Sequence, residues 1–275
     1  AVAPSISFAP SVATTLAVNI GQSGWTDSDT YVAKYDVADA NVEVNGVTID
    51  VTAAKDAAGN EQADYAQVSE FSVDTLAPVA NSLSPADGAV GVALDTDLVI
   101  TFSEQAVKGA GNIVIRKSSD DSVVETIAVT NARVTVVGAL ATIDPSSHLT
   151  SETGYYVQID SGVFEDLAGN DYAGISDKTA WNFVTADTLP PQLLTVEPLP
   201  NTHLAAPDAI VFATYNRNLD ASSVTDQNFV VHAMHTGQLL ESGNPANSIT
   251  VSGATITMNP GNSFHPGELV QVTAT

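Results

Sequence analysis

Two nearly identical acidic pentapeptides have the composition of a metal-binding loop. Residues 56–60 read DAAGN, and residues 166–170 read DLAGN. Aspartate offers carboxylate oxygens, asparagine offers an amide oxygen, and glycine permits a turn that aims carbonyl oxygens inward. Ca²⁺ takes six to eight such oxygens at roughly 2.3–2.6 Å. The residue types therefore suit calcium binding.

An aspartate-containing segment follows each pentapeptide, with the sequence DTLAP at 74–78 and DTLPP at 187–191. We expect each pentapeptide and the segment after it to meet at one pole of a module and to share a calcium ion. The expected ligands are Asp56, Asn60 and Asp74 at the first joint, Asp166, Asn170 and Asp187 at the second, and Glu104 as a further ligand. The alternative is that each pentapeptide is only a turn, because Asp and Asn often bond their own backbone.

Catalytic chemistry has little support in the sequence. His232 and His235 are an odd number of residues apart on an expected strand, so they point to opposite faces and do not share a zinc ion. The sequence contains no G-x-S-x-G, H-E-x-x-H or phosphate-binding glycine loop. We predict that the chain is not an enzyme.

The two tryptophans lead to different expectations. Trp25 lies in the polar segment SGWTDSDT, where it either stacks on a sugar ring or closes the open end of a sandwich. Trp181 begins WNFVT (181–185), the expected last strand of the second module, and is expected in a core. Asp27 and Asp29 have the D-x-D spacing of some metal sites, which is a weak signal in so acidic a chain.

Charge and composition exclude several kinds of partner. The chain has 32 acidic and 8 basic residues, a net charge of -24. Nucleic acids and anionic membrane surfaces both attract clustered Lys and Arg, so neither is an expected partner. No apolar run approaches the roughly 18 residues that span a bilayer, so we expect no direct membrane insertion. The absence of cysteine excludes disulfides, thiolate catalysis and Cys-based zinc sites.

Short strands must position these residues. Apolar and β-branched runs alternate with Gly, Asn, Asp and Pro throughout the 275 residues, and no segment keeps a period of 3.6. We predict an all-β fold of antiparallel β-sandwiches, with a hairpin turn at Asn45-Gly46. The Pro-containing segments divide the chain into modules at 1–76, 77–188 and 189–275. By internal comparison of the second and third modules, the third module lacks its last strand.

The modules resemble tandem bacterial Ig-like domains. The second and third are similar to the S-layer-type Ig-like family through GAVGV, ITFSE, DLAGN and WNFVT, and the first is similar to another bacterial Ig-like repeat through its SGWTDSDT and FSVDTLAP segments. Members of the family like the first module carry one or two more strands before PSISF, so the resemblance implies that the first module begins after its own first strands. It also implies that the chain is a piece of a large Gram-negative surface adhesin of the repeats-in-toxin type. Surface adhesins with such repeats often bind calcium near the linkers, so the resemblance also implies calcium at the joints between modules.

The resemblance implies a structural rather than a catalytic function. We expect an extracellular extender region of a bacterial surface protein, with calcium-stiffened joints and neighbouring Ig-like repeats as partners. One alternative is a module that binds a surface glycan or protein. Another is an accessory region of a secreted polysaccharide-degrading enzyme. If a neighbouring chain completes the third module, strand exchange would give a dimer.

Overall fold

The computed structural model divides the chain into two compact units, residues 1–188 and residues 189–275. It describes residues 3–56, 58–63, 65, 67–199, 206, 208–225, 229–233, 239–240, 248–259 and 269–274. The first unit contains the predicted first and second modules, and the second unit is the predicted third module. The predicted 76/77 boundary lies in the first unit between β7 and β8. His203, His235 and His265 lie outside the described residues.

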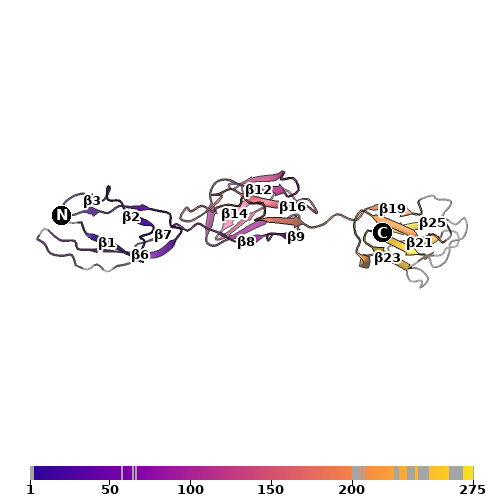
Figure 1. The fold of residues 1–275 in the computed structure, drawn as a ribbon, viewed down its shortest axis with the longest axis horizontal. Helices are drawn as coiled ribbons and strands as arrows, with labels where there is room; N and C mark the ends of the chain where they lie inside the picture. Colours follow the sequence, from indigo (N-terminus) through magenta and orange to yellow (C-terminus); the bar gives the residue numbers. More distant parts are fainter. Residues whose placement is uncertain are drawn as a thin grey trace. The chain divides into compact units, whose positions relative to one another are not determined.

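The first module is built from short strands around a small core. Its strands are β1 (Ser5–Ala9), β2 (Leu16–Val18), β3 (Gly24–Trp25), β4 (Tyr31–Val32), β5 (Tyr35–Val37), β6 (Glu43–Thr52) and β7 (Phe71–Asp74). They form the sheets β1-β6-β7, β2-β5 and β3-β4, all antiparallel (Figure 1). Val12, Val47 and Val73 are buried between the sheets, with Phe8 and Phe71 packed against them.

The predicted hairpin at Asn45-Gly46 is wrong. Strand β6 runs through this dipeptide without turning, and its register with β7 shifts between Val44 and Val47. Gly46 has a φ of 66°, which an extra, bulged residue can use. The dipeptide therefore produces a β-bulge within one strand.

The second module is a two-layer sandwich. Its strands are β8 (Ala80–Ser84), β9 (Ala89–Val92), β10 (Leu98–Phe102), β11 (Ala106–Lys108), β12 (Asn112–Lys117), β13 (Val123–Ala128), β14 (Val134–Val137), β15 (Leu140–Ile143), β16 (Gly154–Ile159), β17 (Phe164–Asp166) and β18 (Asn182–Thr185). One layer is β14-β15-β10-β8, the other is β13-β12-β16-β18-β9, and β11 pairs with β17. Only the β18-β9 pair is parallel among these ladders.

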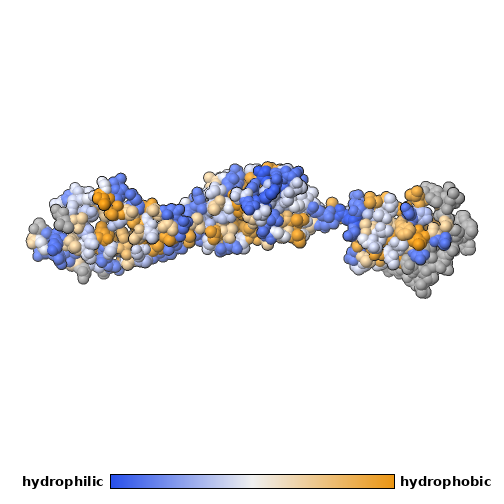
Figure 2. All heavy atoms as spheres, in the orientation of Figure 1, coloured by the Kyte–Doolittle hydropathy of each residue, from blue (hydrophilic) through white to orange (hydrophobic). Residues whose placement is uncertain are grey.

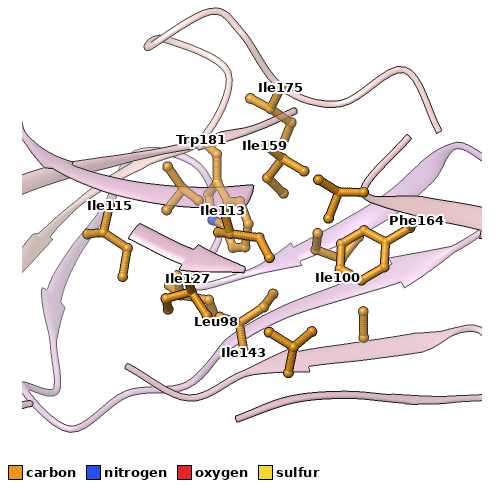
Figure 3. Close-up of a cluster of buried hydrophobic side chains, with 14 of the residues drawn as sticks. Leu98, Ile100, Ile113, Ile115, Ile127, Ile143, Ile159, Phe164, Ile175 and Trp181 are labelled. Atoms are coloured by element: carbon orange, nitrogen blue, oxygen red, sulfur yellow. The ribbon is translucent and has the colours of Figure 1, made fainter. Parts of the chain in front are cut away.

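Alternating residues from both layers fill one core in the second module. Figure 3 shows Ile100 and Ile143 from one layer and Ile113 and Ile159 from the other directed into the same space. Trp181, immediately before β18, is fully buried, and its Nε1 donates to the carbonyl oxygen of Pro85 at 2.8 Å. The prediction that Trp181 belongs to a core is confirmed.

The second unit has a similar plan. Its strands are β19 (Leu193–Glu197), β20 (Val211–Tyr215), β21 (Phe229–Ala233), β22 (Leu239–Leu240), β23 (Ser248–Ser252), β24 (Thr255–Asn259) and β25 (Val270–Ala274), with one 3₁₀ turn, η1 (Ala221–Ser223). The sheets are β19-β20-β24-β23 and β22-β21-β25. Among the described residues, β25 pairs with β21 alone, whereas β16 pairs with both β12 and β18.

The all-β prediction is confirmed, and η1 is the one helical element in the described residues. No helix in that part of the chain has the length and apolar character needed to cross a bilayer. On the face drawn in Figure 2, apolar residues are scattered in small groups among polar ones.

Candidate metal centre

The DLAGN loop closes on its own aspartate. Asp166 Oδ1 accepts hydrogen bonds from the backbone N–H groups of Ala168 and Asn170, both at 2.8 Å. The Asn170 amide nitrogen donates to Asp166 Oδ2 at 2.8 Å. Gly169 adopts a φ of 90°, which a residue with a Cβ atom rarely takes. The sequence thus encodes a turn, stabilised by one carboxylate.

The DAAGN loop has the same geometry. Asp56 Oδ1 accepts from the N–H groups of Ala58 (2.9 Å) and Asn60 (2.8 Å), and the Asn60 amide nitrogen donates to Asp56 Oδ2 at 2.7 Å. Gly59 has a φ of 88°. The Asn60 side-chain and backbone hydrogen bonds lower the pKa of Asp56. Both copies therefore form the turn that was the alternative to a metal site.

Burial separates the two copies. Asp56 is exposed, whereas Asp166 is only 1% exposed. Strand β17 pairs with β11 and places Asp166 opposite Ala106. From this position, the Asn170 amide nitrogen also donates to the carbonyl oxygen of Asp74 at 3.3 Å. The second loop therefore contacts the segment that leaves the first module.

Three carboxylates meet at this contact. One oxygen each from Asp74, Glu104 and Asp166 lies within 4.8 Å of the other two. Asp74 ends β7, Glu104 follows β10, and Asp166 ends β17. We call these three residues the acidic group.

Burial and neighbouring negative charges act together on Glu104 in the acidic group. Burial raises the pKa of Glu104, and the negative charges of Asp166, Asp74 and Glu43 raise it further. The ion pairs found among the described residues lie elsewhere, at Lys55–Glu61, Arg133–Glu125 and Lys178–Asp121. None of the lysines and arginines in these three ion pairs offsets the charge of the acidic group.

The donor atoms fit a hard divalent cation. All three side chains offer carboxylate oxygens, which Ca²⁺ and Mg²⁺ prefer, and no histidine or cysteine belongs to the group. Asp166 already accepts three hydrogen bonds from its own loop. Its remaining lone pairs, together with the oxygens of Asp74 and Glu104, would supply part of the coordination shell, and water would supply the rest.

The structure groups the predicted ligands differently from the sequence-based expectation. The expected meeting of Asp56 with Asp74 at one pole is wrong, because Asp74 pairs with Glu43 at the start of β6 and the DAAGN loop follows the end of β6. Nine residue steps along that strand correspond to roughly 30 Å.

The same relation holds in the second module. Asp187 is exposed and follows β18, whose pairing with β16 places it near the start of β16. The DLAGN loop follows the other end of β16, through β17. Each loop therefore lies at the amino-terminal pole of its module, and the second loop meets the linker that precedes it.

Glu43 is a charged neighbour of the acidic group that sequence reasoning missed. It lies directly opposite Asp74 in the β6–β7 ladder and contributes to the raised pKa of Glu104. The register of β6 with β7 would have identified Glu43, because it places Glu43 opposite Asp74. A hairpin at Asn45-Gly46 would have ended the strand there, so the expected hairpin led away from this register.

Trp25 lies on the small hairpin formed by β3 and β4. It is 37% exposed and packs edge-on against Tyr31, with ring centroids 5.4 Å apart. Asp27 Oδ1 accepts from the N–H groups of Asp29 (2.8 Å) and Thr30 (2.7 Å), so it closes the turn of this hairpin.

Comparison with known proteins identifies one domain. Residues 74–185 match the family model of a bacterial Ig-like domain. This matched segment includes all three members of the acidic group. Domains of this kind are typically non-enzymatic and fit a structural module at the cell surface or outside the cell. No curated protein matches the chain.

Two solved structures of S-layer proteins are distantly similar. The N-terminal part of the bacterial S-layer protein SbsC is 16% identical, with a TM-score of 0.29, over 72% of this chain and 44% of that one. The S-layer protein rSbsC(31-844) gives 16% identity and a TM-score of 0.29, over 73% and 26%. The chain spans less than half of either protein, and similarity at this level carries no argument about function.

Proposed function

We propose that this chain, whose residues 74–185 form a bacterial Ig-like domain, is a non-enzymatic extender region of a large bacterial surface adhesin. It consists of three Ig-like modules, 1–76, 77–188 and 189–275, that act mechanically outside a Gram-negative cell. Its partners are neighbouring Ig-like repeats. The net charge of -24 argues against nucleic acid as a partner.

Calcium at the acidic group stiffens the first joint in this proposal. The observation that carries it is the meeting of Asp74, from the end of the first module, with Glu104 and Asp166 of the second. An ion held by all three would tie the linker to the second module. At ten times its dissociation constant, the ion would add about 1.4 kcal/mol to stability.

Calcium also removes repulsion. Two carboxylates 4 Å apart repel each other by about 1 kcal/mol in water, and by more where solvent is partly excluded. The linker would therefore bend freely in EDTA and resist bending in calcium.

Terbium luminescence and small-angle scattering on the full chain test this function. We expect terbium to bind, calcium to displace it, and the ensemble of conformations to narrow in calcium. Asp74→Asn with Glu104→Gln should abolish these effects. Asp95→Asn with Asp97→Asn, at exposed positions before β10, makes the same change of charge and should preserve them. Equal responses from the two double variants would refute the proposed site.

A ligand-binding function is the second candidate. Exposed Trp25, packed against the partly buried Tyr31, offers a rigid aromatic surface beside acidic residues, as sugar-binding sites often do. A glycan array with the full chain would show binding that Trp25→Ala removes. An array without any signal would contradict glycan binding and would favour the mechanical function. An accessory role in a polysaccharide-degrading enzyme would instead require a catalytic domain in the same reading frame.

A further inference from the structure

The second unit repeats the strand order of the second module. Its sheet β23-β24-β20-β19 matches β14-β15-β10-β8, and its sheet β22-β21-β25 matches β13-β12-β16 (Figure 1). The matching strands also follow one another in the same order along the chain. Strand β25 of the second unit therefore corresponds to β16 of the second module.

Two core-facing residues of β25 correspond to two of β16. Residues 156–159 read YVQI, and residues 269–272 read LVQV. Val157 and Ile159 belong to the core of the second module, and Val270 and Val272 pack against the core of the second unit. In each strand the two residues share one face, because side chains alternate along a strand.

In the second module, later residues of the chain cover the edge of β16 that lies away from β12. Val157 N donates to the carbonyl oxygen of Trp181 at 2.9 Å. Ile159 exchanges two backbone hydrogen bonds with Ile175, at 2.9 and 2.8 Å. The backbone polar groups of these two core-facing residues thus point away from β12 and are paired.

The corresponding edge of β25 has no partner strand among the residues that the structure describes. Strand β25 runs antiparallel to β21, as β16 does to β12, so the N–H and C=O groups of Val270 and Val272 point to this edge. We call it the open edge of β25. Such a row of backbone groups is a template for the addition of another strand.

Burial differs at the corresponding positions. Val157 and Ile159 are 0% and 4% exposed, whereas Val270 and Val272 are only partly buried. The buried core residues described in the second unit all come from β20 and β24 of the opposite sheet: Val211, Ala213, Ile256 and Met258. Incomplete burial in the second unit therefore affects the core-facing residues of the strand with the open edge.

The second module shows which side chains complete such a core. Trp181 and Phe183 are two residues apart, are 0% and 1% exposed, and belong to the same core as Val157. The segment that carries them, WNFVT, contains no charged residue. A strand of this kind can therefore add apolar burial to an acidic chain without adding charge repulsion.

We infer that the open edge of β25 binds an extended segment of a neighbouring Ig-like repeat, antiparallel to β25 and with aromatic side chains at two alternate positions. Main-chain hydrogen bonds to Val270 and Val272 would give affinity, and the two aromatic side chains would give specificity. Pairing of two copies through β25 fits less well, because it brings together two chains of net charge -24 and supplies no aromatic side chain. The inference rests on the proposed function only for the source of the segment.

A labelled peptide tests the inference with the full chain. The peptide has the sequence of residues 179–187, and fluorescence anisotropy measures its binding in EDTA. We expect saturable binding, and at least about tenfold weaker binding of the peptide that carries Trp181→Ser and Phe183→Ser. No binding, or equal binding of the two peptides, would overturn the inference.

Hydrogen exchange and two variants of β25 locate the binding. The peptide should slow exchange at the amides of Val270 and Val272, and binding without this protection would overturn the inference. Val272→Pro removes an N–H group that faces the open edge and keeps the hydrogen bonds to β21, so it should abolish binding. Gln271→Ala changes the exposed outward face and should bind like the wild type. If Val272→Pro does not fold, the two peptides and the protection of the wild type still decide.

Light scattering on the chain alone separates the proposed partner from a second copy. We expect a monomer, and a dimer that protects the amides of Val270 and Val272 would overturn the inference. The calcium measurements concern Asp74 and Glu104 in the first unit. A chain without a calcium response would therefore leave the peptide to decide this inference, and failure of the peptide would leave the calcium proposal to its own test.

Discussion

Asp166 and Asp56 make the same hydrogen bonds in different surroundings, so together they separate the effect of burial from that of loop geometry. Asp166→Ala leaves the backbone N–H groups of Ala168 and Asn170 without the buried carboxylate that accepts their hydrogen bonds. We expect it to lower the free energy of unfolding by about 2 kcal/mol, even after the relief of repulsion at Glu104. Asp56→Ala removes equivalent bonds at an exposed site and should cost clearly less. Urea denaturation measures both, and equal losses would contradict the role given to burial.

Glu104 should make stability depend on pH in a direction opposite to most carboxylates. Burial and the charges of Asp166, Asp74 and Glu43 raise its pKa above its ordinary value of 4.5. The folded chain therefore holds this proton more tightly than the unfolded chain, and the resulting stability is lost as pH rises through the raised pKa.

The variant Glu104→Gln isolates this effect from all other titrating groups. In EDTA, the melting temperatures of the variant and the wild type should nearly coincide at acidic pH, where Glu104 is protonated. Above the raised pKa, the variant should melt higher. A difference that stays constant across the titration would show that the repulsion is absent.

At the scale of elements, the bulge in β6 makes one glycine important. Gly46 has a φ of 66°, and a Cβ built there would meet only Ser69 Oγ at 3.5 Å. Space is therefore available, and the cost of Gly46→Ala comes from the backbone, about 1 kcal/mol. Gly24→Ala is the control, because its Cβ would meet nothing within 4 Å and its φ is not positive. Similar midpoints for the two variants in urea would contradict the strained bulge.

The sequence predicted the type of the elements better than their pairing. Apolar alternation identified strands such as β10 and β16, because one face of each is buried in the core. Asn-Gly is compatible with both a hairpin turn and a bulge, since glycine provides the positive φ that each can use. Only the partners of β6 decide between them, and those partners lie far away in the sequence.

At the candidate site too, the residue types were predicted better than the residues that come together. Asp74, Glu104, Asp166 and Asn170 were all expected to lie near a joint, from their residue types and their proximity to linkers. The pole at which each loop lies depends on the direction of the strand before it, which local spacing does not reveal. The second loop therefore meets the preceding linker, and Asp187 belongs to the opposite pole.

At the scale of the whole molecule, calcium should act on a small part of the chain despite the net charge of -24. Most carboxylates are exposed and screened by salt beyond about 8 Å, so they gain little from a specific ion. The acidic group differs, because it combines partial burial with three convergent charges.

Hydrogen exchange on the full chain can locate this response. Calcium should slow exchange in peptides that contain β7, the start of β8 and the 166–170 loop. Peptides from β19 and β20 should exchange equally in calcium and in EDTA, because the described residues of the second unit contain no comparable group of three carboxylates. Magnesium is the control for ionic strength, since it demands octahedral geometry and gives up its water reluctantly. Uniform protection of all acidic segments by both ions would indicate charge screening and would contradict a discrete site at Asp74.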